Sequence, residues 1–359
     1  MLGLRGNWKE AELMKAGLVG YAQTGKTTLF NALTGQNVQT GGAGKAKSNL
    51  GVIKVPDERL TRLTAIYKPR RTVPAEILFV DVPGPRTKGS GIDGVTIQAL
   101  QEMDALAVVL RGFPALDATL AQPVRELADF EAELILNDLA VVERRVERLV
   151  KERSNDRQKA VLTQCLDHLN AERPLRHLEL PAEDEREISS FAFLSRKPLL
   201  AVLNTTEANV VTPIPEDLVA ACHDRRLEVI SVCASLEAEI AALAPEEQAE
   251  FLAGLGIAEP ASALLIRAAY ALLDYISFFT VGEDEVRAWQ VYRGSKAPKA
   301  AGRVHSDIER GFIRAEVMAY EEFIPVANEA KMREIGKLRV EGKEYVMKDG
   351  DIVNFRFAV

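Results

Sequence analysis

Residues Gly20-Tyr21-Ala22-Gln23-Thr24-Gly25-Lys26-Thr27 fit the pattern G-x-x-x-x-G-K-[ST], and this motif is the strongest indication of the fold in the sequence. An apolar run that reads as a strand, Lys15–Gly20, precedes this loop, and a helical pattern begins at Thr27. In this context the glycines let successive backbone N–H groups face inward, and the helix N-terminus adds partial positive charge. The sequence therefore predicts a loop that binds the phosphates of a purine nucleoside triphosphate.

Two side chains of this loop have predicted chemical roles. Lys26 supplies an ammonium group for the β- and γ-phosphates, and Thr27 offers its hydroxyl to Mg²⁺. Water is the expected nucleophile, and we identify no side-chain base, so Lys26 is assigned only as a phosphate-stabilising residue. The predicted nucleotide-binding residues of this segment are Gly20, Gln23, Thr24, Gly25, Lys26, Thr27 and Thr28.

A second motif is the apolar run Leu78-Phe79-Val80-Asp81-Val82-Pro83-Gly84, which ends in D-x-x-G. At the end of a buried strand that follows a phosphate loop, this pattern indicates a sensor of the metal and the γ-phosphate. We predict that Asp81 holds the Mg²⁺ shell and that the N–H of Gly84 contacts the γ-phosphate. Loss of that phosphate would then release the glycine-rich segment behind it.

The base-reading loop is expected after the strand Pro198–Asn204, where the chain continues with Thr205-Thr206-Glu207. A guanine site has N-K-x-D here, and its Asp carboxylate accepts the N1–H and the exocyclic amine of guanine. In this chain Thr205 replaces the lysine and the longer Glu207 replaces the aspartate. A displaced carboxylate should lose discrimination for guanine. We therefore expect Asn204 and Glu207 to flank the base, and ATP to be preferred to GTP.

The first half of the chain alternates short apolar runs with helical patterns, which is typical of a mostly parallel sheet covered by helices. Between about Leu127 and Arg196 the alternation stops, and apolar residues follow the heptad spacing of a coiled coil. We predict two antiparallel helices there, forming an arm between the fourth and fifth predicted strands. The stripe comprises Ile135, Leu139, Val142, Val146 and Leu149, and Leu162, Leu166 and Leu169 repeat it. The predicted strands are 15–20, 51–56, 76–82, 105–113, 198–204 and 227–234.

Near Phe278 the pattern changes to short β-like runs separated by glycines, at 287–292, 312–319, 344–347 and 352–357. We expect a small separate β-rich domain. The predicted organisation is an N-terminal extension (1–13), a P-loop nucleotide-binding domain (14–126 and 196–277), the inserted helical arm (127–195) and this C-terminal domain (278–359).

Composition narrows the class of protein. Apolar residues make up 47% of the chain and charged residues 27%, which is typical of globular proteins. No apolar run approaches the length of a membrane span, and the first residues lack a signal-peptide pattern, so we expect no membrane partner. Three separated cysteines form no C-x-x-C pair, so the sequence supports neither a disulfide framework nor a structural zinc site, and this fits a reducing cytoplasm.

The distribution of charge bears on RNA as a partner. The net charge of −7 argues against a protein that coats nucleic acid generally. Basic residues between Arg287 and Arg314 nevertheless cluster around Trp289 and Tyr292. This cluster is compatible with an RNA-facing surface and, because acidic residues lie among the basic ones, equally with a mixed charged surface.

Together with these motifs, the C-terminal third of the chain resembles YchF, the Obg-like ATPase family of translation-factor-related GTPases. The resemblance runs from about Lys15 to Val359 in one collinear order. It implies a Ras-like G domain, an inserted helical arm and a C-terminal TGS-type domain of β-grasp form. It also implies a preference for ATP with some GTP binding, and an association with ribosomes or translation. The most specific stretches are 287–289, 294–298, 300–307, 309–317, 336–339, 341–343 and 349–351, with 55–60 and 72–75 as further matches.

Other site predictions come only from this resemblance. A later base-contacting loop of the family reads Cys233-Ala234-Ser235 here, which assigns Ala234 to the base. Pro85 follows D-x-x-G, where it cannot orient water, so the resemblance implies slow intrinsic hydrolysis. Gln23 replaces the usual Asn of the phosphate loop, which puts monovalent-cation assistance in doubt. The segment 41–48 lacks the threonine that closes over Mg²⁺ in the family, and Thr40 and Ser48 are the candidate substitutes.

We therefore expect an ATP-preferring P-loop NTPase with Mg²⁺ as cofactor and a low intrinsic rate, acting as a ribosome- or translation-associated switch. Two alternatives stay open. One is a nucleotide-gated adaptor for the ribosome or RNA with negligible hydrolysis, and the other is a GTP-preferring GTPase. The sequence leaves the oligomeric state open.

Overall fold

The computed structural model describes residues 13–39, 48–84, 91–115, 119–152 and 157–358. These residues form two compact units. The P-loop unit comprises Met14–Ile53 and Leu78–Leu265, and the C-terminal unit comprises Leu13, Lys54–Ile77 and Ile266–Val359.

The P-loop unit is built on a sheet in which β1 (Lys15–Val19) lies near the centre of the order β2-β4-β1-β5-β6-β7. Strand β1 runs parallel to β4 and β5, and the pairs β5–β6 and β6–β7 are also parallel. Their carboxyl ends therefore meet at one edge, which is where ligands bind in such sheets. The other strands are β2 (Asn49–Lys54), β4 (Glu76–Asp81), β5 (Ala105–Arg111), β6 (Leu199–Asn204) and β7 (Val229–Val232).

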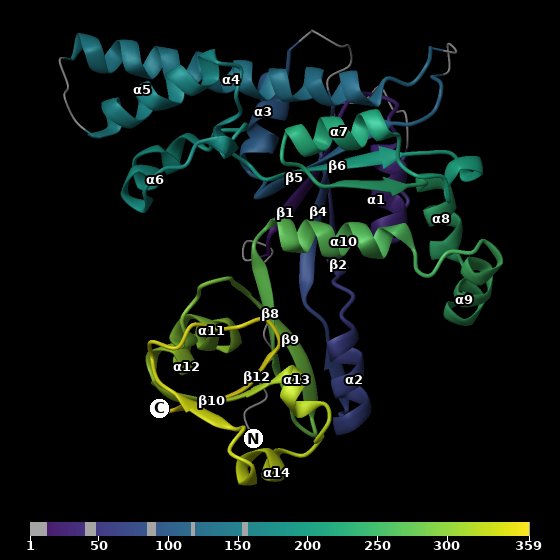
Figure 1. The fold of residues 1–359 in the computed structure, drawn as a ribbon, viewed down its shortest axis with the longest axis vertical. Helices are drawn as coiled ribbons and strands as arrows, with labels where there is room; N and C mark the ends of the chain where they lie inside the picture. Colours follow the sequence, from purple (N-terminus) through teal and green to yellow (C-terminus); the bar gives the residue numbers. More distant parts are fainter. Residues whose placement is uncertain (1–12, 40–47, 85–90, 116–118, 153–156, 359) are drawn as a thin grey trace. The chain divides into compact units, whose positions relative to one another are not determined.

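Helices lie beside this sheet (Figure 1). Strands β5 and β6 are buried along their whole length, as the unbroken apolar runs predict for strands covered on both faces. The helices and turns of this unit are α1 (Lys26–Thr34), α3 (Gly94–Gln101), η4 (Glu207–Asn209), α7 (Glu216–Asp224), α8 (Ala234–Ala242) and α9 (Pro245–Gly254). Helix α10 (Ala261–Leu272) begins in this unit and continues into the C-terminal unit.

The helical arm lies between β5 and β6. Its long helix α4 (Pro123–Lys151) packs against α5 (Arg157–Asn170), and the two are drawn side by side in Figure 1. Every residue of the predicted heptad stripe belongs to the shared core of these helices, buried or partly buried. The chain returns to the sheet through η2 (Leu175–His177), α6 (Ala182–Ile188) and η3 (Ser189–Phe191).

Asp138 of α4 fixes the end of this return. Its buried carboxylate accepts hydrogen bonds from the backbone N–H groups of Leu194 (2.9 Å) and Ser195 (2.7 Å). The Ser195 hydroxyl donates a third, at 2.6 Å. An unpaired buried carboxylate would be costly in free energy. These three hydrogen bonds therefore fix the segment that precedes β6 against helix α4.

The C-terminal unit has a second sheet, of order β11-β10-β12-β8-β9-β3. Strands β8 and β9 form an antiparallel pair, β12 lies parallel to β8, and β10 is antiparallel to β12 and β11. This mixed order, with a helix against one face, fits the predicted β-grasp form. The elements are α2 (Glu58–Tyr67), β3 (Arg71–Val73), β8 (Tyr275–Thr280), β9 (Glu285–Tyr292), α11 (Ala297–Val304), α12 (Ser306–Arg310), β10 (Phe312–Ala319), α13 (Tyr320–Phe323), α14 (Glu329–Glu334), β11 (Arg339–Glu341) and β12 (Asp351–Phe357).

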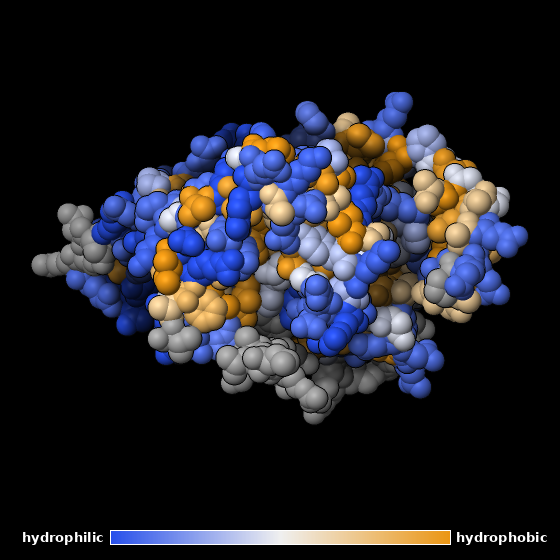
Figure 2. All heavy atoms as spheres, turned by 90° about the horizontal axis from the view of Figure 1, so that it is seen from below, coloured by the Kyte–Doolittle hydropathy of each residue, from blue (hydrophilic) through white to orange (hydrophobic). Residues whose placement is uncertain are grey.

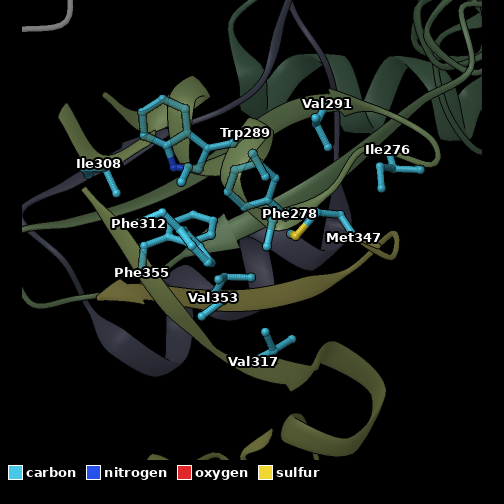
Figure 3. Close-up of a cluster of buried hydrophobic side chains, with 14 residues drawn as sticks. Ile276, Phe278, Trp289, Val291, Ile308, Phe312, Val317, Met347, Val353 and Phe355 are labelled. Carbon is cyan, nitrogen blue, oxygen red and sulfur yellow. The ribbon is translucent and has the colours of Figure 1, made fainter. Parts of the chain in front are cut away.

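Aromatic side chains dominate the core of this unit (Figure 3). Phe278 stacks on Trp289 and meets Phe355 edge to face, and Phe355 also contacts Phe312. The Trp289 indole donates its N–H to the Thr280 hydroxyl at 2.8 Å, which satisfies its polar atom inside the core. Trp289 thus has a packing role.

Two expectations differ from the structure. The segment Lys54–Ile77 was expected in the nucleotide-binding domain, but it groups with the C-terminal unit because β3 pairs with β9, with Thr72 opposite Val286. The run 344–347 was expected to be a strand. It is instead a non-strand segment with an isolated bridge between Lys296 and Val346, and its Met347 side chain fills the aromatic core.

The surface is mixed. Figure 2 shows polar and apolar residues mixed on the displayed face. Scattered exposed apolar residues of this kind are common on protein surfaces. Within the described residues, no helix combines the length and the apolar composition that a membrane span requires.

Candidate nucleotide-binding site

The phosphate loop connects the carboxyl end of β1 to α1, and its shape requires glycine. Gly20 has φ 129° and Gly25 has φ 88°, both in the region that side chains with a Cβ rarely adopt. A Cβ on Gly20 would lie 2.6 Å from the Val109 carbonyl oxygen, and one on Gly25 would lie 2.1 Å from Nδ2 of Asn204. The loop therefore packs against β5 and β6 through its backbone.

The start of α1 is suited to an anion. Gly25 is the N-cap residue, no side chain caps this end, and the first turn contains no acidic residue. The first N–H groups of a helix have no intrahelical partners, and the helix dipole favours negative charge there. The Thr24 hydroxyl donates to the Tyr21 carbonyl at 3.1 Å, which links two residues of the loop. Thr28 is half-buried in α1 and Gln23 is exposed with φ 64°.

Lys26 lies inside the loop, where only 8% of it is exposed. Its ammonium donates to the carbonyl oxygens of Gly20 (2.8 Å) and Tyr21 (2.6 Å). Burial lowers the pKa of Lys26 from 10.5 to about 8, and the nearby Asp81 carboxylate opposes this shift. Burial disfavours the ammonium form of Lys26, and the two neutral carbonyl oxygens offset this cost only in part. The negative charge of a bound polyphosphate would offset more of it.

This shift predicts how ATP affinity depends on pH. Phosphate oxygens favour the ammonium form of Lys26. Below about pH 8 the free protein already carries this form, whereas above about pH 8 Lys26 must take up a proton when ATP binds. We expect constant affinity below about pH 7.5 and, above pH 8, a fall of up to about tenfold per pH unit. Calorimetry at pH 8.5 in buffers of different ionisation enthalpy should detect the proton taken up. An affinity that stays flat from pH 7 to 9.5 would contradict this account.

Oxygen ligands for a divalent cation lie beside the loop. The Thr27 hydroxyl donates to Oδ2 of Asp81 at 2.9 Å, and Asn49 Nδ2 lies 3.4 Å from the same oxygen. Asp81 is 7% exposed, and burial raises the pKa of its carboxyl despite these hydrogen bonds. One hydroxyl, one carboxylate and the phosphates of a nucleotide are the ligand set that suits Mg²⁺. The described residues contain no cluster of three or more His, Cys, Asp or Glu side chains that would bind a metal without a nucleotide.

Gly84 closes this side of the loop. A Cβ on Gly84 would lie 1.9 Å from the Gly20 carbonyl oxygen and 3.0 Å from Nζ of Lys26. The backbone of the D-x-x-G motif thus contacts the phosphate loop directly. This position suits a backbone N–H that reports a terminal phosphate.

Asn204, at the end of β6, joins two loops. Its Nδ2 donates to the Thr24 carbonyl at 2.8 Å, and its Oδ1 accepts from the Ala234 N–H at 3.0 Å. Its buried side chain therefore holds the phosphate loop and the β7–α8 loop together. Glu207 lies at the start of η4 and is exposed. The structure thus brings Asn204 and Ala234 together. Among the described residues of the phosphate loop, none forms a hydrogen bond with the Glu207 side chain.

Sequence reasoning missed the contacts between the phosphate loop and helix α4. The Tyr21 hydroxyl donates to Oε1 of Glu133 at 3.3 Å, and burial together with Glu133 raises the pKa of this phenol. Glu126, which is 2% exposed, accepts from the Arg111 backbone N–H at 3.0 Å. Glu133 belongs to the segment predicted to form the arm, and its partner Tyr21 is 112 positions away along the chain, so no local pattern indicated this contact.

Some expectations fall on residues outside the described part of the chain. These are the first-switch segment 40–47, with Thr40, and Pro85 after D-x-x-G. Ser48, the other candidate substitute for the switch threonine, is described and directly precedes β2.

Two family models match separate parts of the chain. A model described as a 50S ribosome-binding GTPase matches residues 15–144. A model of the C-terminal domain of YchF GTPases, described as a protein of unknown function, matches residues 275–358.

Curated relatives align with nearly the whole chain. The Ribosome-binding ATPase YchF of Bacillus subtilis is 38% identical over 364 residues, covering 96% of this chain and 100% of the relative. The protein of the same name from Escherichia coli O157:H7 is 38% identical, covering 96% and 99%. The solved structure of the Schizosaccharomyces pombe YchF GTPase superposes with a TM-score of 0.85 at 26% identity, covering 96% of this chain and 97% of that one. The predicted resemblance and fold class are confirmed.

Proposed function

The chain belongs to the YchF family, and from this premise we propose that it binds ATP with Mg²⁺, hydrolyses it slowly and acts as a switch at the ribosome. One observation carries this proposal: the buried Lys26 ammonium and the Thr27 hydroxyl lie at the start of α1, and Asp81 at the end of β4 accepts a hydrogen bond from that hydroxyl. Cation and hydroxyl–carboxylate groups at a helix N-terminus are the chemistry that a magnesium-bound triphosphate needs.

The residues of the chain would divide the work as follows. Lys26 would leave the carbonyls of Gly20 and Tyr21 for the β- and γ-phosphates, and the loop N–H groups would bind the remaining phosphate oxygens. Thr27 and Asp81 would hold Mg²⁺, which neutralises charge on the phosphates when it is bound. Gly84 would donate its N–H to the γ-phosphate. No side-chain base is assigned, so positioning and charge stabilisation supply the catalysis.

The proposed preference for ATP rests on the base-reading loop. Asn204 fixes the Ala234 N–H beside the phosphate loop, so a base bound there would contact the start of α8. The carboxylate expected to recognise guanine is the exposed, longer Glu207, whose geometry differs from that of an aspartate at this position. Adenine does not need that carboxylate, whereas guanine loses two hydrogen bonds without it.

The proposed partner is the ribosome. The relatives from Bacillus subtilis and Escherichia coli are named ribosome-binding ATPases. The arginines and lysines of the C-terminal unit support a contact with RNA. Some of their charge is neutralised within the protein, because the single carboxylate of Glu316 pairs with Arg314, Arg333 and Arg356. We further propose a cytoplasmic location, which the three buried free cysteines support.

Nucleotide affinities and phosphate release test this function. With Mg²⁺ present, we expect ATP to bind at least about tenfold more tightly than GTP, because a missed polar match to a base costs at least that much. Steady-state phosphate release should be slow alone and faster with ribosomes. A large preference for GTP would overturn the base argument in favour of a GTPase. Phosphate release at background level, with ribosome binding that still depends on ATP, would instead identify an adaptor.

A further inference from the structure

We propose that Asn49 is a positioning residue for the magnesium site, and that its side-chain amide orients the carboxylate of Asp81. This inference rests on the proposed function, because it assigns a role within the site proposed for magnesium and nucleotide. Asn49 is the first residue of β2, and β2 is the neighbour of β4 in the sheet. Asp81 is the last residue of β4, so the sheet itself places the two side chains together.

The hydrogen bonds distinguish the two oxygens of Asp81. Thr27 Oγ1 (2.9 Å) and Asn49 Nδ2 (3.4 Å) both contact Oδ2. Within the described residues, the hydrogen bonds to this carboxylate use that one oxygen, which leaves Oδ1 for the shell of a cation. An amide donor on one side and a hydroxyl on the other fix the plane of the carboxylate.

The site has a physical need for such a donor. Asp81 is almost fully buried, so protein groups rather than bulk water must hold its carboxylate in place. The Thr27 hydroxyl and the Asn49 amide are the side-chain donors that contact it within the described residues. Mg²⁺ demands near-ideal octahedral geometry, so a carboxylate that rotates freely binds it poorly. Outer-shell partners of this kind typically change metal affinity by about 10- to 100-fold.

The competing interpretation is that Asn49 only anchors the start of β2. The chain offers a matched control for this, because Gln36 also contacts the start of this strand. Its Nε2 donates to the Leu50 carbonyl at 2.8 Å, and this contact does not involve Asp81. Gln36→Ala therefore removes an anchor of β2 while the Asn49–Asp81 contact stays in place.

The experiment measures the gain in affinity that Mg²⁺ gives to a fluorescent ATP analogue, as the ratio of its Kd in EDTA to its Kd in excess Mg²⁺. Asn49→Ala is expected to reduce this ratio by about tenfold, with the Kd in EDTA changed less than about twofold, because the lost contact acts through the metal. Gln36→Ala should leave the ratio unchanged. Asn49→Leu, which keeps the number and branching of the side-chain heavy atoms and removes the donor, should behave as Asn49→Ala and carries the test if the alanine variant does not fold.

The outcomes separate this inference from the proposed function. A wild-type protein whose affinity for the analogue is the same with Mg²⁺ and with EDTA would remove the metal site, and this inference with it. A normal gain in the wild type that persists in the folded Asn49 variants would overturn the inference and leave the function standing. An equal loss in Gln36→Ala would reduce Asn49 to an anchor of β2.

Discussion

Lys26→Ala is expected to weaken ATP binding by about 10²–10³-fold, the largest effect of any single change in the site. Hydrogen bonds to charged groups contribute about 1.5–3 kcal/mol each, and Lys26 would exchange two carbonyl partners for at least as many phosphate oxygens. Every 1.4 kcal/mol corresponds to about tenfold in affinity. Calorimetric titration with ATP and Mg²⁺ at pH 7 measures the change, and phosphate release should fall to background in the same variant.

The same substitution should not destabilise the protein without nucleotide. Burial disfavours the Lys26 ammonium, so its removal relieves a desolvation cost as it removes two hydrogen bonds. Lys15→Ala is the matched control, because Lys15 carries the same charge on β1 and pairs with Glu102 at 3.7 Å, outside the loop. That variant should bind ATP normally. If Lys26→Ala binds ATP as tightly as the wild type while it is folded, the phosphate loop is not the nucleotide site.

Gly84→Ala is expected to abolish the preference for ATP over ADP and to destabilise the fold. The new Cβ would lie 1.9 Å from the Gly20 carbonyl oxygen, a backbone atom that cannot turn away. The D-x-x-G backbone must therefore move away from the phosphate loop, and its N–H can no longer reach the γ-phosphate. Overpacking of this kind costs about 1–3 kcal/mol in the free energy of unfolding. Urea unfolding and separate ATP and ADP affinities measure the two effects.

Gly94→Ala provides the control for the loss of a glycine. Gly94 is the first residue of α3, and a Cβ there would meet no atom within 4 Å. We expect stability equal to the wild type or higher by about 0.4–1 kcal/mol, since alanine restricts the unfolded chain more than glycine does. ATP and ADP affinities should stay at wild-type values. A Gly84→Ala protein that still distinguishes ATP from ADP would show that this backbone does not sense the terminal phosphate.

The elements that could be predicted from the amino-acid sequence are those whose signals are local. The phosphate loop is a continuous motif between a strand and a helix, and the stripe from Ile135 to Leu149 has the spacing of a packed helix pair. Each depends on residues that are neighbours along the chain or on one helix face, so spacing alone reveals them. For the same reason the buried strands β5 and β6 were predicted from their unbroken apolar runs.

Contacts between segments that are distant in the sequence became visible in the folded chain alone. Strand β3 has three residues and no strong pattern, and its pairing with β9 is what places Lys54–Ile77 in the C-terminal unit. The contacts of Tyr21 with Glu133, of Asn49 with Asp81, and of Asn204 with both Thr24 and Ala234 likewise join separate loops. Strand order and helix packing set these contacts, because they bring together side chains that are far apart in the sequence. Local propensity depends on neighbouring residues and therefore cannot indicate such pairs.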